Sequence, residues 1–104
     1  MPYGLTEKII QKVNSVFANY ENIEEVILYG SRAKGNYSAG SDIDLTLKAQ
    51  RLTLSQLNKV SIDLDDLLLP YTFDLSIFDH ISNPDLLEHI EWVGISFYKR
   101  PKAV

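Results

Sequence analysis

Residues 28–35 read LYGSRAKG, and residues 40–45 read GSDIDL. A Gly-Ser pair closes an apolar run, ten residues intervene, and two aspartates then stand one residue apart inside a second apolar run. Gly30 permits a sharp turn, and the backbone N–H groups that follow it can bind an anion. A phosphate cradle followed by a carboxylate pair is typical of proteins that move a nucleotide from a nucleoside triphosphate.

The neighbouring segments have the periodicity of regular elements. Apolar residues at helical spacing predict an amphipathic helix over residues 5–20. Short apolar runs predict a strand over 25–29 and an alternating strand over 42–48. Between these strands, we expect residues 31–34 to form one helical turn with Ser31 as its N-cap.

The second half of the chain carries clear start and stop signals. Thr53-x-x-Gln56 is a capping box that opens a helix, and Pro70 ends it. Alternation predicts a third strand over 71–78, and Asn83-Pro84 opens a last helix that ends at Gly94. The expected buried stripe of the earlier helix is Leu54, Leu57, Val60, Leu64, Leu67 and Leu68.

A short edge strand is expected over residues 95–98, after the last helix. The order α-β-β-α-β-α predicts an α+β fold in which helices pack against one small mixed sheet. With 104 residues, of which 45% are apolar, the chain can bury one core, so we expect a single domain over residues 1–104.

Composition narrows the class of protein. No apolar run reaches the ~20 residues that span a bilayer, and residues 1–4 show no leader. We therefore expect a cytoplasmic protein without membrane contact; with no cysteine it cannot form a disulfide framework. The net charge of −4 argues against direct binding of nucleic acid, although bound divalent cations would make an acidic site suitable for a nucleotide.

The aspartates are the candidate metal ligands. Asp42 and Asp44 are two residues apart on a strand and share one face, and Asp74 lies on the polar face of the third strand. If the third strand neighbours the second, three carboxylates converge and repel one another unless cations lie between them. Oxygen ligands of this kind suit Mg²⁺, or Mn²⁺, and two ions could stabilise an in-line displacement.

Four further residues are candidate nucleotide contacts. Ser31 can bind a phosphate oxygen through its hydroxyl, and Ser41 directly precedes the aspartate pair. Arg32 and Lys34 can add positive charge to the cradle, although both fit ordinary surface positions equally well. The Walker pattern is absent.

Several other side chains have no clear chemical assignment. His80 and His89 have no partner at metal-ligand spacing, so a surface or partly packed position is expected for both. Tyr37 fits a place over a nucleotide base or an exposed loop position equally well. Trp92, Phe97 and Tyr98 fit a partner surface, but a core position for Trp92 is at least as good.

At this point the chain resembles a known family. Gly30-Ser31, ten residues and Asp42-x-Asp44 match the nucleotidyltransferase superfamily that includes DNA polymerase beta, and the compact form is similar to the minimal nucleotidyltransferases, the MNT proteins. The resemblance implies a nucleotidyltransferase palm in which Asp42, Asp44 and a third aspartate, by position Asp74, hold two Mg²⁺ ions. It extends from residue 5 to about residue 98.

The resemblance also implies a partner. MNT proteins are commonly encoded beside HEPN-domain ribonucleases and act as their antitoxins, and members transfer AMP from ATP to a tyrosine of the toxin. Larger nucleotidyltransferases add a domain that binds the acceptor, whereas here the palm accounts for the whole sequence, so we expect a HEPN toxin to supply the acceptor in a hetero-oligomer. Asp74 is then the expected general base.

Two other functions fit the same residues. The chain could be an antitoxin that neutralises its partner by binding alone, with catalysis lost. It could also be an enzyme that nucleotidylates a small molecule such as an aminoglycoside.

Overall fold

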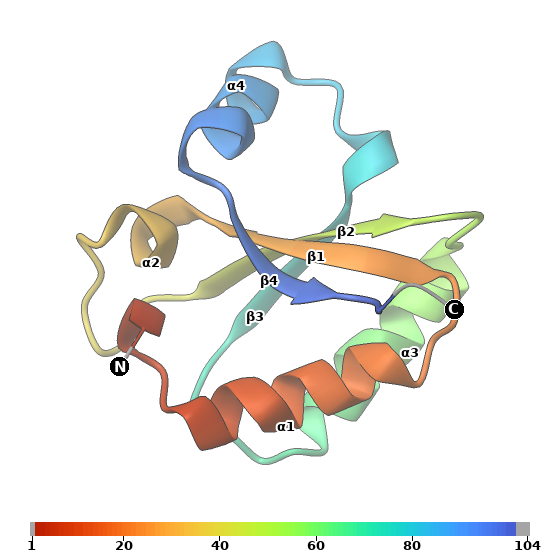
Figure 1. Ribbon diagram of the computed structural model, residues 1–104, viewed down its shortest axis with the longest axis horizontal. Coiled ribbons are helices and arrows are strands. Elements are labelled where there is room, and N and C mark those ends of the chain that lie inside the picture. The colour runs from red at the N-terminus through yellow and green to blue at the C-terminus, as the bar shows by residue number, and fades with distance from the viewer. Residues whose placement is uncertain (1, 102–104) are drawn as a thin grey trace.

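The computed structural model describes residues 2–101 and contains a four-stranded mixed sheet with helices on both faces (Figure 1). The strand order is β3-β2-β1-β4. β1 (Ile23–Tyr29) runs antiparallel to β2 (Ile43–Ala49) and to β4 (Ile95–Lys99), and β2 runs parallel to β3 (Phe73–Ile77). The predicted α+β class, the mixed sheet and the edge strand are confirmed. The single domain expected over residues 1–104 stays a prediction, and residues 1 and 102–104 lie outside the described part.

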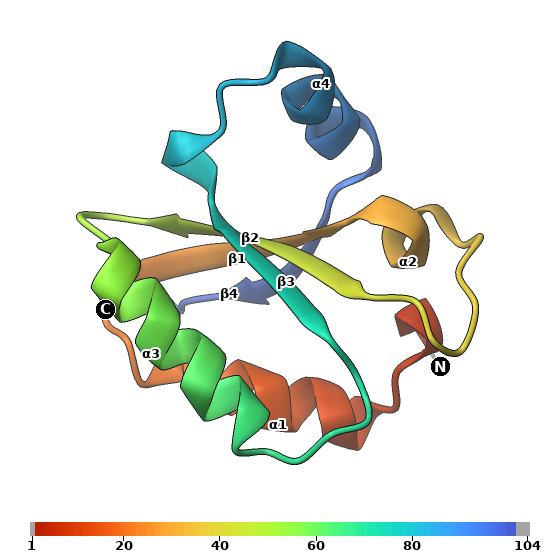
Figure 2. The ribbon, with the colours of Figure 1, turned by 180° about the vertical axis from the view of Figure 1, so that it is seen from behind.

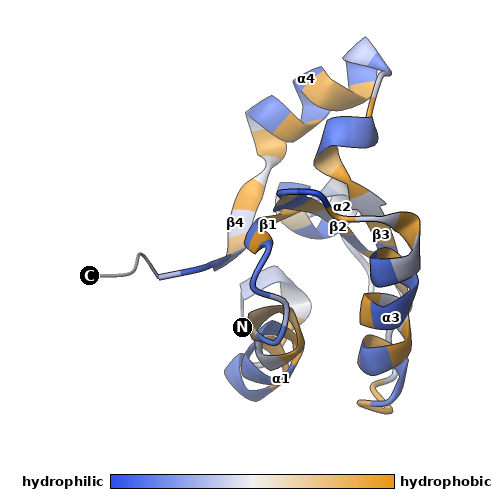
Figure 3. Cartoon of the chain, turned by 90° about the vertical axis from the view of Figure 1, so that its right-hand side faces the viewer, coloured by the Kyte–Doolittle hydropathy of each residue, from blue (hydrophilic) through white to orange (hydrophobic). Residues whose placement is uncertain are grey.

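The helices form two layers of different extent. α1 (Glu7–Ala18) and α3 (Leu54–Asp65) lie side by side on one face of the sheet, while α4 (Pro84–Val93) stands on the other face (Figures 2 and 3). The short helix α2 (Gly30–Lys34) continues directly from the end of β1. Single 3-10 turns lie at η1 (Pro2–Gly4) and η2 (Phe78–His80).

The main core lies between the sheet and the α1–α3 layer. Alternate apolar residues of β1 and β2 point into it, as the strand period of two requires, and the apolar stripes of both helices meet them. Its members include Val26, Leu28, Ile43, Leu45, Leu47 and Ile77 from the strands, and Val13, Val16, Phe17, Val60 and Leu64 from the helices. The opposite face of β2 and β3 is therefore free to carry polar side chains.

The predicted helix starts are confirmed at two places. Thr53 and Gln56 form the complete capping box at the start of α3. The Asn83 side chain accepts hydrogen bonds from the first turn of α4, where Pro84 is the first helical residue. These local signals succeeded because each satisfies backbone donors at the helix start without help from distant residues.

Two details of the predicted helices are wrong. Leu54 is 65% exposed and Leu68 is 89% exposed, so neither lines the core. Leu54 is the first residue of α3, and Leu68 lies beyond its end with a φ of 55°. Ser31 is not the N-cap of α2, because the helix begins at Gly30 and Tyr29 takes the cap position.

A long-range clamp joins the last strand to the start of the sheet. The Arg100 guanidinium donates hydrogen bonds to the carbonyls of Tyr20 (2.6 Å) and Ile23 (3.0 Å), and the latter lies 77 residues away in sequence. The same group reaches the carbonyls of Phe17 and Ala18 at the end of α1. A cation at a helix C-terminus is favourable because the last carbonyls lack helical partners.

None of the helices within residues 2–101 is long and apolar enough to cross a membrane.

Candidate active site

The Gly-Ser turn packs directly against the second aspartate. In the antiparallel β1–β2 pair, Tyr29 lies opposite Asp44. The chain then turns at Gly30, whose φ is 76°, and a Cβ at this position would overlap the Asp44 carboxylate. Both the backbone angle and the close approach require glycine. The structure thus brings together the two motifs that were ten residues apart in sequence.

The third aspartate lies beside the second across the parallel strand pair. Asp74 is the register partner of Asp44, and Asp42 precedes Asp44 by two residues. The expectation that the third strand neighbours the second is confirmed, and the register sets Asp74 beside Asp44. Asp42 and Asp74 are exposed, whereas Asp44 is partly buried between them.

The crowding of negative charge changes the titration of the site. Burial raises the pKa of Asp44 above its usual range, and repulsion from Asp74 and then Asp42 raises it further, while His89 opposes the shift. Burial likewise raises the pKa of the neighbouring Tyr29 hydroxyl, with Asp74 and Asp44 adding to it. A cation placed among these groups would relieve the repulsion.

The three carboxylates are therefore the kind of ligand that a hard divalent cation requires. Carboxylate oxygens without nitrogen or sulfur ligands are what Mg²⁺ prefers. As the side chains stand, however, no three His, Cys, Asp or Glu residues within the described part of the chain are arranged to hold a metal ion. The assignment of Asp42, Asp44 and Asp74 as metal ligands accordingly stays a prediction.

Arg32 is buried and binds the main chain. It is only 2% exposed, and its Nη1 donates to the Tyr3 carbonyl (2.8 Å). Its Nε donates to the carbonyl of Ser41 (3.1 Å) and its Nη2 to that of Ala39 (3.3 Å). Arg32 was expected to add charge to a phosphate cradle. The structure differs, because all three guanidinium nitrogens are engaged with carbonyl groups.

Two tyrosine rings flank the same guanidinium. Its carbon lies 5.4 Å from the centre of the Tyr37 ring and 5.1 Å from that of Tyr71. Such cation–π contacts help to offset the cost of burying a charge. Tyr37 thus packs on Arg32 and is partly buried, while a place for its ring over a nucleotide base stays a prediction. Since Ser41 adjoins Asp42 and Tyr71 precedes Asp74 by three residues, Arg32 joins the segments that lead to both aspartates.

The other three side chains predicted to contact a nucleotide differ in their exposure and hydrogen bonding. Ser31 is partly buried in α2, and Lys34 is exposed at the end of that helix. The Ser41 hydroxyl accepts a hydrogen bond from the Ser38 amide (2.8 Å) and so stabilises the loop before Asp42. Direct contact of these side chains with a nucleotide stays a prediction.

The sequence did not predict the position of His89 at the candidate active site. The Gly30 amide donates a hydrogen bond to Nε2 of His89 (3.0 Å), and the imidazole meets the Tyr29 ring edge-on, with centroids 6.1 Å apart. His89 lies on α4, 59 residues from Gly30, so no local spacing pattern could have indicated the contact.

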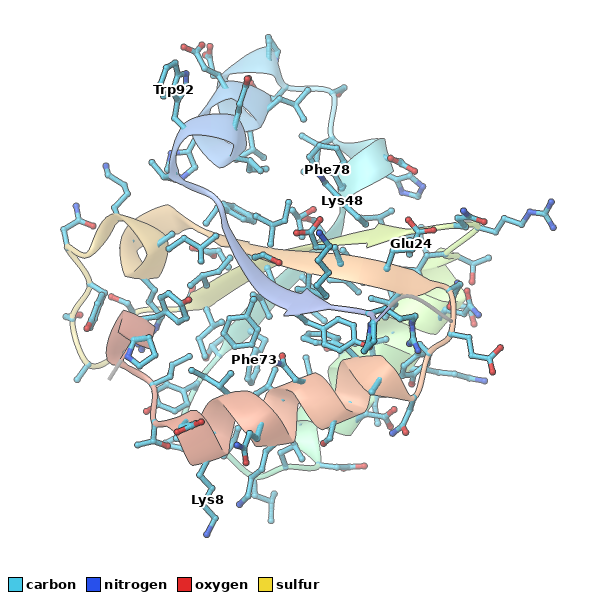
Figure 4. The ribbon with its side chains drawn as sticks, viewed as in Figure 1. Lys8, Glu24, Lys48, Phe73, Phe78 and Trp92 are labelled. Carbon is cyan, nitrogen blue, oxygen red and sulfur yellow. The ribbon has the colours of Figure 1, made fainter. Side chains whose placement is uncertain are left out.

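A pocket of about 430 Å³ lies between α4 and the polar face of the sheet, but away from the aspartates. Its lining includes Ile27, Leu87 and Ile90, together with Lys48, whose Nζ lies 4.8 Å from the centre of the Phe78 ring. Figure 4 shows Lys48 and Phe78 close together below α4.

Comparison with known families identifies the fold. Residues 11–103 match the family described as polymerase beta, nucleotidyltransferase. The chain belongs to this nucleotidyltransferase family. No curated protein sequence matches it.

Solved structures with the same fold include nucleotidyltransferases from toxin–antitoxin systems. A chain of a toxin–antitoxin complex with AMP-PNP superposes with a TM-score of 0.70 at 23% identity, covering 92% of this chain and 75% of that one. A chain from the complex of tri-AMPylated Shewanella oneidensis HEPN toxin with MNT antitoxin gives 0.68 at 17% identity, covering 92% and 74%. A putative nucleotidyltransferase from Sulfolobus solfataricus gives 0.58 at 22%, covering 89% and 79%. These similarities establish the nucleotidyltransferase fold.

Proposed function

We propose that this chain transfers AMP from ATP to a tyrosine hydroxyl of a HEPN-type toxin and thereby acts as its antitoxin. The observation that carries the proposal is the register pairing of Asp44 with Asp74, beside Asp42 and against the Gly30 turn. Family membership supports nucleotidyl transfer, and the similar complexes with AMP-PNP and with a tri-AMPylated toxin support the donor and the acceptor.

Asp42, Asp44 and Asp74 would hold the divalent cations of this reaction, either two Mg²⁺ or Mn²⁺ ions. When bound, the metal supplies positive charge that neutralises the triphosphate and favours departure of pyrophosphate. Burial and then repulsion from Asp74 and Asp42 raise the pKa of Asp44, and a bound cation would relieve that repulsion, which supports this assignment.

The other groups of the site bind the donor and accept a proton. The Gly30 turn gives phosphate access to the main chain, and Ser31, Lys34 and Ser41 are the proposed contacts to ATP. The tyrosine oxygen forms a bond to the α-phosphorus, the bond from that phosphorus to the pyrophosphate oxygen breaks, and the phenolic proton passes to Asp74. Asp74 suits this role because it is exposed at the strand where an acceptor can approach.

The test uses ATP labelled at the α-phosphate, Mg²⁺ and a purified HEPN-domain protein as the candidate acceptor. Label should appear on a tyrosine of that protein and disappear with a metal chelator. Changing both Asp42→Asn and Asp44→Asn should lower the rate of transfer by at least about a hundredfold, because both carboxylates would hold the cations that stabilise the transition state. The matched control changes Asp65→Asn and Asp66→Asn, which removes the same charge at the end of α3.

Label that persists in the Asp42→Asn/Asp44→Asn variant would exclude these residues as the catalytic pair. Measuring toxin neutralisation in cells distinguishes the proposed enzyme from an antitoxin that acts by binding alone. That alternative predicts full protection by the double variant despite lost transfer, whereas the proposal predicts that protection is lost while the complex still forms.

A further inference from the structure

The outer side of α4 carries one exposed stripe. Asp85, Glu88 and Trp92 are three and four residues apart, so they share a helix face, and all three are exposed. The opposite side of the helix packs toward the sheet through Ile90, which is buried, and Leu87, which lines the pocket below. We call Asp85, Glu88 and Trp92 the α4 stripe.

Trp92 is the most conspicuous member of the stripe. It is 80% exposed, and in Figure 4 its indole points away from the sheet at the far end of the molecule. An exposed tryptophan offers a large apolar surface, and tryptophan is enriched among the residues that dominate protein interfaces. Within residues 2–101, the other strongly exposed large apolar residues are Leu54, Ile62 and Leu68. They belong to α3 or to the turn after it, on the opposite side of the sheet.

The charge of α4 defines the chemistry of a matching surface. Pro84–Val93 contains Asp85, Glu88 and Glu91 and has no lysine or arginine. A surface that covers Trp92 must also lie against these carboxylates, and complementary charge then requires lysines or arginines around an apolar recess. The ribonuclease partner that the resemblance to MNT proteins implies would carry such a basic surface, because it binds the phosphates of RNA.

The same helix contacts the candidate active site. His89 lies next to Glu88, and its Nε2 accepts the hydrogen bond from the Gly30 amide (3.0 Å). A protein bound on the α4 stripe would therefore contact the helix that itself touches the Gly-Ser turn. Such a partner could present an acceptor hydroxyl to the site from the α4 side of the sheet.

We propose that the acceptor protein docks on the α4 stripe through a basic surface that receives Trp92. The inference rests on the proposed function for the nature of the partner. Its test measures binding, so that its result does not depend on whether transfer occurs.

The experiment measures, as a function of salt concentration, the affinity of this chain for the HEPN-domain protein that accepts AMP in the transfer test. Trp92→Ala should raise Kd at least about tenfold, as expected for a central interface tryptophan. Reversing both Asp85→Lys and Glu88→Lys should raise Kd by at least about tenfold and flatten its salt dependence. The matched controls, Leu68→Ala and Asp65→Lys/Asp66→Lys, should change Kd by less than about twofold.

Binding of AMP-PNP with Mg²⁺ serves as the check that each variant is folded, and it should be unchanged by Trp92→Ala. Equal effects of Trp92→Ala and Leu68→Ala on Kd would overturn the proposal. So would a Trp92→Ala variant that keeps partner affinity but loses self-association in ultracentrifugation, since the stripe would then contact a second copy of this chain. If AMP transfer fails while the stripe variants still weaken binding, the proposed chemistry is wrong and the docking surface stands.

Discussion

Gly30 combines two constraints that can be separated by mutation. Its φ of 76° disfavours any side chain, and a Cβ would also displace the Asp44 carboxylate. Gly35, at the other end of α2, has a similar φ of 88°, but open space surrounds its Cα. The two glycines therefore share a backbone conformation and differ in what they touch.

We expect Gly30→Ala to lower the stability of the protein by about 1–2 kcal/mol and AMP transfer by about a hundredfold. Gly35→Ala should cost a similar ~1–2 kcal/mol and leave the transfer rate within a few fold. Urea unfolding and single-turnover transfer measure the two effects. Similar losses of activity in both variants would show that strain alone, and not contact with Asp44, sets the requirement at Gly30.

Arg32 should act on the geometry of the site without touching the donor. Arg32→Lys keeps the charge but cannot donate to three carbonyls at once, so we expect a loss of ~2–3 kcal/mol in stability. The kcat for transfer should fall by about tenfold, with little change in the KM for ATP, because the loop before Asp42 loses its anchor.

Lys34→Met provides the contrast on the same helix. Lys34 is exposed, so its loss should leave stability unchanged and raise the KM for ATP if it contacts a phosphate. A large KM effect in Arg32→Lys, with kcat preserved, would return Arg32 to the role of a phosphate ligand.

At the scale of the elements, one side-chain pair links α1 to α3. The Tyr20 hydroxyl, just after α1, donates a hydrogen bond to the Asp63 carboxylate on α3. Burial, together with this hydrogen bond and the charge of Asp63, raises the pKa of Tyr20 from 10.0 to about 12. The folded state therefore holds the phenolic proton more tightly than the unfolded chain does.

Stabilisation from Tyr20 should be complete below pH 10 and should disappear as the pH rises toward 12. Tyr20→Phe should cost about 1 kcal/mol at pH 8, and the difference from the natural chain should shrink above pH 10. Urea unfolding at several pH values measures this. Tyr98→Phe, whose ring packs on Phe17, is the control, and an equal pH trend in both variants would contradict the assignment.

The elements themselves were largely predictable, for physical reasons that differ among them. α3 and α4 begin where the capping residues satisfy their first backbone donors, and this chemistry is local. Strand alternation placed Asp44 and Asp74 on one face of the sheet because side chains alternate in any β-strand. The predicted burial of Leu54 and Leu68 was wrong, because the spacing of apolar residues does not reveal where a helix stops covering the core.

Sequence patterns could not predict the contacts of Arg32 and His89. A basic residue after a Gly-Ser turn gives the same sequence pattern whether its side chain binds a phosphate or a main-chain carbonyl. Arg32 is buried only because Tyr3, Tyr37 and Tyr71 converge on it from separate segments. His89 contacts Gly30 from 59 residues away, on a helix that leads into β4, which pairs with β1.

At the scale of the whole molecule, the two faces of the sheet have different tasks. The face under α1 and α3 holds the core, whereas the other carries the carboxylates and is only partly covered by α4 (Figures 1 and 3). Substitutions on the α4 side can therefore change binding or transfer at little cost in stability. Metal ligation, nucleotide contacts and a cytoplasmic location stay predictions, since they depend on components other than this chain.

The long-range ties of β4 also determine when the site can exist. Arg100 binds the carbonyl of Ile23, 77 residues earlier, and β1 lies between β2 and β4 in the sheet. We expect contacts between residues so distant to form late in folding. Closing the large loop between them costs conformational entropy before the contacts can offset that cost. While the ribosome is still making the chain, Gly30 and Asp44 are already present but His89 and β4 are not. On the proposed function, the active-site surface should therefore be complete only after synthesis has passed Arg100, so AMP transfer should begin only once β4 has been made.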